Sequence, residues 1–196
     1  MKKLLSVLLL SVMIIAATGC EGSFNVSTGD DDDEGQADLN SELSQTFNTD
    51  KFGYTMNYPE GWEKQEDATA YVLVVANGMA SVAIQNLASV EMGGTYGSAD
   101  DVVTEFKAQL EQAQDIQIED GEDVLYTLED GTQVTAKQFV AQYTIPEDNA
   151  TYKQWQLVIP RPDGKVFHSW SYTSLVENYD AYLPAAQAML ETWAMI

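Results

Sequence analysis

Three dipeptides with strong turn propensity constrain the fold of this chain more than any other feature. Asn77-Gly78, Asp130-Gly131 and Asp163-Gly164 each join a residue that tolerates a left-handed backbone to a glycine that adopts one freely. Such pairs form two-residue hairpin turns, whose twist matches that of antiparallel strands. The sequence therefore predicts three antiparallel strand pairs.

The stretches beside these turns have the residue pattern of strands, because they are rich in β-branched and aromatic residues and are bounded by turn signals. They cover residues 71–75 and 80–87, 124–128 and 133–145, and 152–159 and 166–173. An earlier strand, 52–58, ends in the turn Tyr58-Pro59-Glu60-Gly61-Trp62. There the proline fixes φ and the glycine permits a tight bend.

Two segments have helical periodicity instead. The first, about 99–114, follows Ser98, a good N-cap, and Asp101 completes a capping box three residues later. The second, about 179–195, contains Pro184, which we expect in its first turns or at a kink. The predicted apolar stripes of the two helices are Val103, Phe106, Leu110 and Ala113, and Leu183, Ala186, Leu190 and Trp193.

The strand 133–145 carries apolar residues on both faces, with Phe139 and Tyr143 on one and Val134 and Val140 on the other. A sheet that is apolar on both sides needs a cover on both sides. We therefore expect an α+β protein. Its predicted architecture is an α/β/α sandwich, in which a mainly antiparallel sheet of about 6–8 strands has one helix on each face.

The N-terminus has the features of an export signal. Lys2 and Lys3 precede an apolar run over residues 4–17, and small residues lead to Cys20, the only cysteine, in Ala17-Thr18-Gly19-Cys20. The run is shorter than the roughly 20 residues that a spanning helix needs. These features predict export. The segment is then a signal peptide of the ordinary secretory kind, a retained transmembrane anchor, or the signal peptide of a lipoprotein.

A cysteine at this position resembles the bacterial lipoprotein lipobox, in which the thiol is acylated and becomes the mature N-terminus. The resemblance implies a lipid anchor on Cys20, although position 17 is alanine where leucine is more frequent. Two or more acyl chains hold a protein stably on a bilayer. We expect a signal peptide over residues 1–19, a lipidated cysteine and acidic flexible tether over 20–44, and a single domain over 45–196.

The charge of the chain is strongly acidic, with Asp+Glu 31 against Lys+Arg 9 and a formal net charge of −22. Part of it lies in Gly29-Asp30-Asp31-Asp32-Asp33-Glu34-Gly35, whose acids repel each other and lack apolar neighbours to pack with. Such a surface repels phosphates, so we expect no nucleic-acid partner. It is compatible with solubility alone, or with attraction of cations or a basic partner.

Few residues are suited to catalysis. His168 is the only histidine, and it shares a predicted strand face with Val166, Trp170 and Tyr172. It is a general base, a metal ligand or a packed strand histidine, and we expect the last because no second histidine or free cysteine accompanies it. The chain lacks a GxSxG elbow, and Gly93-Gly94-Thr95-Tyr96-Gly97 lacks the GK[ST] of a phosphate loop. We expect no catalytic residue, cofactor or metal.

Two acidic turns, Glu119-Asp120-Gly121-Glu122-Asp123 and Glu129-Asp130-Gly131, leave alternatives open. Paired carboxylates serve glycoside hydrolysis when a cleft holds them, acidic turns bind calcium weakly, and solvated turns are the default. The aromatic residues of the last three strands should lie mainly in the core, and any left exposed would anchor a partner. They include Tyr143, Tyr152, Trp155, Trp170 and Tyr172.

The order of elements and two stretches of sequence resemble the PsbP-like family. The stretches are residues 52–62, an aromatic strand ending in a YPxGW turn, and the closing helix around Tyr182-Leu183-Pro184 and Met189-Leu190-Glu191-Thr192-Trp193. The family includes the extrinsic PsbP protein of photosystem II, a Ran-binding nuclear-import factor and many bacterial lipoproteins. The resemblance covers about residues 45–196, and it implies the fold, Trp62 as a core anchor, and binding or assembly without a common catalytic centre.

These features predict a membrane-anchored extracytoplasmic lipoprotein of the bacterial cell envelope. We expect it to act as a non-catalytic protein-binding or assembly module, with the membrane reached through the lipid on Cys20 and a protein as its partner. It should present one exposed aromatic patch or groove and no convergent titratable cluster. The alternatives are an extracytoplasmic carboxylate-based hydrolase and a calcium-responsive surface protein.

Overall fold

The computed structural model describes residues 43–49, 53–66, 71–76, 79–128 and 130–195. The elements follow one another in the order β1 (Gln45–Thr49), β2 (Tyr54–Tyr58), β3 (Trp62–Glu66), β4 (Tyr71–Ala76), β5 (Ala80–Ala88), η3 (Val90–Met92), α1 (Ala99–Leu110), β6 (Gln114–Asp120), β7 (Val124–Thr127), β8 (Gln133–Ile145), β9 (Ala150–Pro160), β10 (Val166–Leu175), α2 (Tyr179–Thr192) and β11 (Ala194–Met195).

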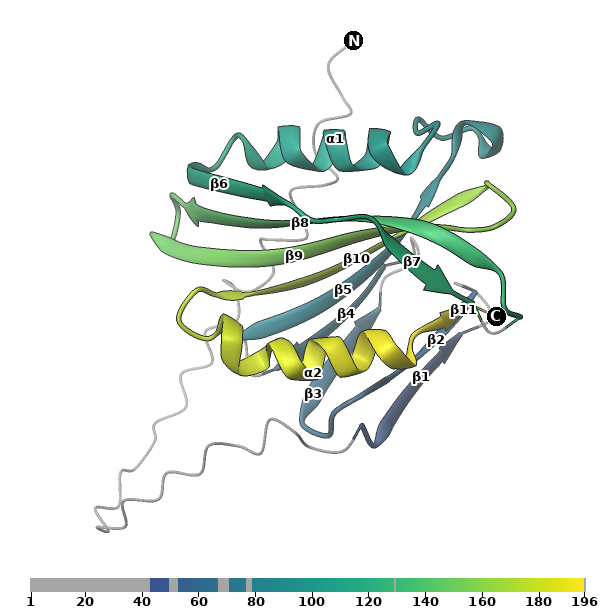
Figure 1. The fold of residues 1–196 in the computed structure, drawn as a ribbon. Helices are drawn as coiled ribbons and strands as arrows, with labels where there is room; N and C mark the ends of the chain where they lie inside the picture. Colours follow the sequence, from purple (N-terminus) through teal and green to yellow (C-terminus); the bar gives the residue numbers. More distant parts are fainter. Residues whose placement is uncertain (1–42, 50–52, 67–70, 77–78, 129, 196) are drawn as a thin grey trace.

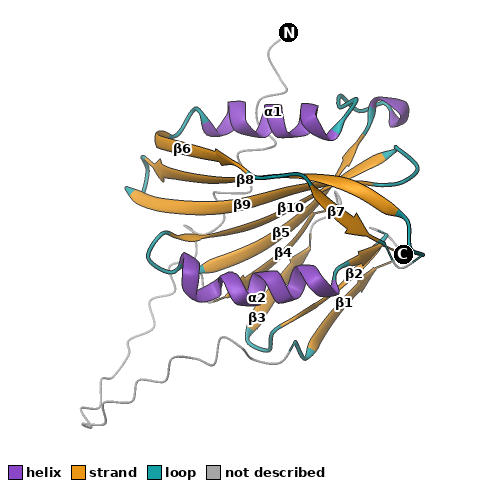
Figure 2. Cartoon of the chain, viewed as in Figure 1, coloured by secondary structure: helices purple, strands orange, loops and turns teal. Residues whose placement is uncertain are grey.

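Eight strands form one sheet, in the order β3-β4-β5-β10-β9-β8-β6, with β7 paired to the first part of β8. The neighbours in this sheet run antiparallel. Helix α1 lies over β8 and β9, and α2 packs on the opposite face against β10 and β5 (Figures 1 and 2). The α/β/α sandwich with a mainly antiparallel sheet is confirmed.

A second sheet of three strands, β1-β2-β11, lies beside α2 and was not predicted. The predicted early aromatic strand corresponds to β2, in which Tyr54 and Met56 are fully buried. Its closing turn also forms, since Trp62 donates its backbone N–H to the carbonyl of Pro59 at 3.3 Å and Gly61 has φ +89°. At the other edge of this small sheet, the C-terminal strand β11 pairs antiparallel with β2.

The three predicted strand pairs are confirmed as β4–β5, β7–β8 and β9–β10. Gly131 and Gly164 have φ values of +83° and +70°, the left-handed conformation that favours glycine. The turns are longer than the predicted two residues, because the hydrogen bonds that close them join Leu128 to Thr132 and Arg161 to Val166. The turn residues Asn77 and Gly78 lie outside the described residues.

The two faces of the large sheet support two separate cores, as the pattern of 133–145 predicts. Alternation along β10 turns Trp170 and Tyr172 toward α2 and Phe167 toward α1. The buried residues on the α2 side are Phe47, Tyr54, Met56, Ala80, Val82, Ile84, Ala136, Leu157, Ile159, Trp170, Tyr172, Tyr179, Ala186, Met189 and Trp193. Those on the α1 side are Leu87, Val102, Phe106, Phe139, Ala141, Tyr143, Tyr152, Val158 and Phe167.

Both helices are shorter than predicted. Helix α1 ends at Leu110 because the chain turns there and residue 114 already begins β6, an edge strand. The predicted stripe is confirmed, since Phe106 is buried and Val103, Leu110 and Ala113 pack against the same core. The stripe omitted Val102, which is fully buried. The capping box is confirmed: the Ser98 hydroxyl accepts from Asp101 N–H at 3.2 Å and the Asp101 carboxylate accepts from Ser98 N–H at 3.0 Å.

Helix α2 ends at Thr192, and the next residue, Trp193, leaves the helix with extended backbone and stays buried. Pro184 lies in its early turns, as expected. The buried positions of α2 are Tyr179, Ala185, Ala186 and Met189.

The predicted signal peptide, Cys20 and nearly all of the predicted tether lie outside the described residues. Within the described part, no helix is long and apolar enough to cross a membrane.

Candidate functional site

His168 lies in the core rather than in an open site. It stands in β10 on the α2 face, is fully buried, and has its Nδ1 2.6 Å from Oδ1 of Asn86. Because the amide oxygen only accepts, Nδ1 carries the proton and the neutral ring packs edge-on against Trp193 and Tyr54, with ring centroids 5.2 and 5.9 Å away. The arrangement is that of a packed strand histidine.

Burial sets the protonation of this ring. Loss of solvation lowers the pKa of His168 to about 3; the positive charge of Arg161 acts in the same direction and the negative charge of Asp163 opposes it. A general base at neutral pH needs a pKa near 7 and access to substrate. The environment of His168 provides neither.

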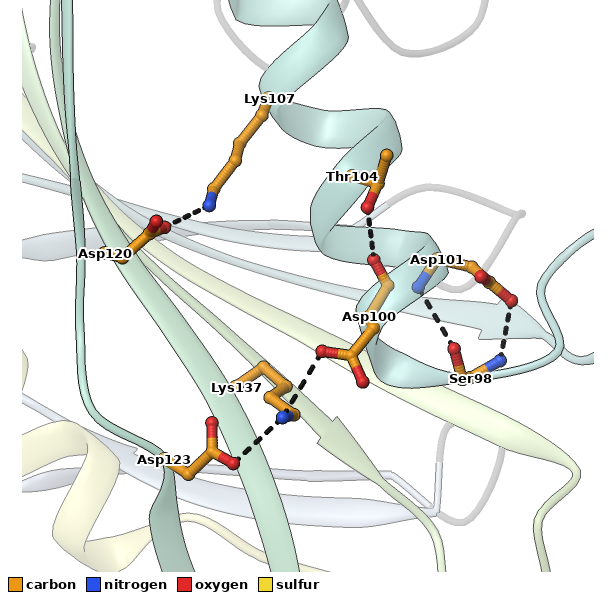
Figure 3. Close-up of polar contacts among 8 residues, drawn as sticks. All are labelled: Ser98, Asp100, Asp101, Thr104, Lys107, Asp120, Asp123 and Lys137. Atoms are coloured by element: carbon orange, nitrogen blue, oxygen red, sulfur yellow. Dashed lines mark hydrogen bonds and ion pairs between the residues drawn. The ribbon is translucent and has the colours of Figure 1, made fainter.

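The first acidic turn holds α1 to the sheet. Lys107 of α1 binds the carboxylate of Asp120, and Lys137 of β8 pairs with Asp123 at 2.9 Å and with Asp100 at 3.3 Å (Figure 3). Exposed pairs of this kind contribute about 0–1 kcal/mol each. Asp100 and Asp123 meet at the ammonium of Lys137, and Asp120 is paired with Lys107, so each of these carboxylates is neutralised by a lysine. This pairing is unlike the free acids of a hydrolase or of a calcium loop.

The second acidic turn is a local hydrogen-bonded turn. The carboxylate of Asp130 accepts the backbone N–H of Thr132 at 2.8 Å, and this bond lowers the pKa of Asp130. Across the part of the chain that is described, no three His, Cys, Asp or Glu side chains lie close enough to hold a metal ion.

The aromatic side chains of the last strands are mostly interior. Tyr143, Tyr152, Trp170 and Tyr172 are buried, and Trp155 is half-buried with its indole N–H donated to Gln138 at 2.9 Å. Trp62 is half-buried too and packs edge-on against Tyr182 of α2 at 6.1 Å. Among the described residues, the most exposed large apolar side chains are instead aliphatic: Met79, Val90, Met92, Leu125 and Val176. The predicted aromatic patch is thus not found among the described residues.

Two of these aliphatic side chains lie in one loop, residues 89–97, which joins β5 to α1. Val90 is 55% exposed and Met92 is 58% exposed. They belong to the short turn η3, at the same end of the molecule as the start of α1 (Figure 1). The sequence shows a glycine-rich connection here, but nothing in it distinguishes Val90 and Met92 from core residues.

Backbone hydrogen bonds hold the 89–97 loop in one conformation. Ser89 N–H donates to the Lys165 carbonyl at 2.9 Å, Val90 N–H to Tyr96 at 2.9 Å, and Gly94 N–H to Ser89 at 2.8 Å. A Cβ on Gly94 would lie 1.9 Å from the carbonyl oxygen of residue 88, so the loop approaches β5 too closely for any other residue. The backbone conformation of the loop is therefore fixed by its contacts with β5 and with Lys165.

The charges around this loop are acidic. Glu91 lies between the two aliphatic residues, and the proximity of Glu105 is one reason that the pKa of Tyr96 is raised, after burial. Within the described residues, neither glutamate forms an ion pair. Most described cations are engaged elsewhere: Lys107, Lys137 and Arg161 in ion pairs, and Lys64 and Lys153 over the rings of Phe47 and Tyr179.

Comparison with known proteins identifies related folds. No family profile matches the sequence, and no curated protein matches it. Among solved structures the chain is similar to LpqN, involved in cell envelope biogenesis of Mycobacterium tuberculosis, at 14% identity and a TM-score of 0.52, over 72% of this chain and 82% of LpqN. It is also similar to cyanobacterial PsbP of Synechocystis, at 17% identity and a TM-score of 0.52, over 78% of this chain and 92% of that one.

A further similar structure is the Saccharomyces cerevisiae Ran-binding protein Mog1p, at 10% identity and a TM-score of 0.51, over 77% of this chain and 94% of Mog1p. At such identities the similarity concerns the fold alone. The arrangement of one helix on each face of a mainly antiparallel sheet is thus the PsbP-like fold that the sequence resemblance implies.

Proposed function

We propose that this chain is a membrane-anchored extracytoplasmic lipoprotein of the bacterial cell envelope that acts as a non-catalytic protein-binding or assembly module. In this proposal residues 1–19 are a signal peptide, Cys20 carries the lipid, 20–44 are an acidic tether and 45–196 are the binding domain. The observation that carries it is the contrast between a buried, neutral His168 and a rigid exposed loop with two aliphatic side chains.

The similar structures give this proposal its context. Mog1p is a Ran-binding protein and LpqN is involved in cell envelope biogenesis, by the descriptions of those proteins. Neither description transfers a partner to this chain. They support a reading in which the fold provides a stable surface, since function resides in sites placed on folds rather than in the folds themselves.

The two alternatives find less support in the geometry. A carboxylate-based hydrolase and a calcium-responsive protein would both need acids that converge on a cleft or an ion. Asp120 and Asp123 are instead bound to lysines that fix α1 (Figure 3).

The anchor is tested by replacing the thiol. Cells that express the full chain or its Cys20→Ser variant are fed a clickable fatty acid and then fractionated. We expect the native chain to be labelled and to sediment with membranes, and the variant to carry no label. Labelling that persists in the variant would exclude Cys20 as the acylated residue.

The binding function is tested in intact cells with a cell-impermeant amine cross-linker and the full-length chain, followed by denaturing purification and mass spectrometry. We expect one partner to recur above its abundance in the envelope, and to be absent when the cells are lysed and diluted before cross-linking. Recovery of the chain alone across growth conditions would contradict a binding module.

A further inference from the structure

We infer that the 89–97 loop is the docking surface of this domain, and that its partner is a protein segment carrying basic side chains beside an apolar one. The inference rests on the proposed binding function and adds the place and the chemistry of recognition. Three features of the loop carry it: the exposure of its apolar residues, its rigidity, and its charge.

Among the described residues, this loop is the one that carries two of the most exposed aliphatic side chains. Val90 and Met92 lie two positions apart, and both are more than half exposed. The other exposed aliphatic residues stand on separate elements: Leu125 on β7, Val176 after β10, and Met79 before β5, where the Tyr182 hydroxyl also approaches its sulfur at 3.6 Å. Single exposed apolar residues are ordinary on protein surfaces, and two in one short turn offer a partner more apolar area at one place than the isolated ones do.

The rigidity of the loop reduces the entropic cost of binding. One end is bonded to the β9–β10 turn through Ser89, and the other is bonded to α1, because Gly97 N–H donates to the Asp101 carboxylate at 2.9 Å beside the capping box of Ser98. A preorganised loop loses little conformational freedom when a partner covers it. The exposed positions of Val90 and Met92 are therefore fixed by the fold.

The charge of the loop specifies the partner. Glu91 and Glu105 lack ion-pair partners in the described part of the chain. The adjoining β9–β10 turn contributes Arg161, Asp163 and Lys165, but Arg161 is paired with Asp163 at 3.9 Å, so the local balance stays acidic. The formal net charge of −22 adds a long-range field of the same sign. A basic segment is attracted by this field, and its apolar side chain covers Val90 and Met92.

The negative charge of the loop argues against a lipid surface as its binding partner. Anionic headgroups are repelled by Glu91 and Glu105, and two aliphatic side chains bury too little apolar area to hold a bilayer. A basic protein segment can form ion pairs with the two glutamates and bury the two aliphatic side chains. We therefore assign the loop to a protein partner.

The test uses the full chain, purified as the cell produces it, and fluorescence anisotropy of a labelled short peptide in which lysines alternate with leucines. A peptide with glutamates in place of the lysines is its control. We expect the lysine peptide to bind and the glutamate peptide not to bind. The double variant Val90→Ser/Met92→Ser should weaken binding by about tenfold or more, since it removes most of the apolar area offered.

The matched control is Leu125→Ser/Val176→Ser, which removes two other exposed aliphatic side chains and should leave the affinity unchanged. Glu91→Gln/Glu105→Gln should weaken binding about threefold to tenfold and reduce its salt dependence. Melting curves of all variants should match, because every altered side chain is solvent-exposed or at the surface. Equal affinity for the Val90→Ser/Met92→Ser variant and the native chain would overturn the inference.

Two further experiments distinguish failure of the docking surface from failure of the binding function. Cross-links in intact cells that persist in Val90→Ser/Met92→Ser would overturn the docking surface while leaving the binding function standing, whereas no partner for the native chain would contradict the binding function itself. Binding of the native chain to vesicles of zwitterionic lipid that is lost in the same double variant would assign the loop to membrane and overturn the protein partner.

Discussion

Acid should destabilise this protein through His168. The folded-state pKa of about 3 lies below the 6.5 of an exposed histidine, because the buried site favours the neutral ring. Between pH 3 and pH 6.5, His168 is protonated in the unfolded chain and neutral in the folded chain. The stability contributed by the neutral ring is therefore complete above pH 6.5 and is lost as the pH falls toward 3.

The magnitude follows from the two pKa values. Each pH unit well below 6.5 costs about 1.4 kcal/mol of unfolding free energy, so a change from pH 7 to pH 5 should cost about 2 kcal/mol. The groups that face the ring, Asn86, Tyr54 and Trp193, carry no charge at these pH values, and the more distant charges of Arg161 and Asp163 act in opposite directions.

The assay is urea unfolding at pH 7 and pH 5, followed by tryptophan fluorescence, for the native chain and for His168→Asn. The many carboxylates of the chain also titrate toward acid, but they do so in both proteins and cancel in the difference. We expect the native chain to lose about 2 kcal/mol more than the variant over this interval. An equal loss in the two proteins would show that His168 is not held neutral, and would refute the reasoning.

Three other predictions concern packing and backbone. Val102→Ala should cost about 2 kcal/mol and Val103→Ala under about 1 kcal/mol by urea unfolding, because only the first side chain is fully buried; equal costs would contradict the observed facing of α1. Ser98→Ala should cost about 1 kcal/mol through loss of the N-cap, and an unchanged unfolding midpoint would argue against the capping box. Gly94→Ala should lower the melting temperature by several degrees, since its Cβ would overlap a β5 carbonyl oxygen; an unchanged melting temperature would show that the loop can move away.

The sequence predicts the parts of this fold that depend on short-range patterns. The hairpins follow from local turn residues, and the alternation of apolar residues along β8 predicts a core on each face of the sheet. The prediction missed β1, β3 and β6, which all lie at sheet edges and have largely polar sequences. These sequences are Gln-Thr-Phe-Asn-Thr, Trp-Glu-Lys-Gln-Glu and Gln-Asp-Ile-Gln-Ile-Glu-Asp. Strand β11 has only two residues and depends entirely on its partner β2.

The candidate site was harder to predict than the fold, because exposure is a tertiary property. Val90 and Met92 are apolar residues after a buried strand, and sequence reasoning assigns such residues to the core. What exposes them is the close approach of Gly94 to β5 and the bond from Ser89 to the β9–β10 turn, which together fold the loop back on itself. Neither contact has a pattern in the sequence.

The distribution of charge connects the fold to the proposed function. The lysines at positions 107 and 137 fix α1 to the sheet, while those at 64 and 153 cover aromatic rings, so few cations remain to neutralise the acidic surface. The single histidine is likewise taken up by packing in the core. The charged groups that remain available to another molecule are thus mainly carboxylates, and a few exposed aliphatic side chains accompany them. Since carboxylates and exposed aliphatic side chains occur together at the 89–97 loop, recognition of a basic partner is the chemistry that this surface supports best.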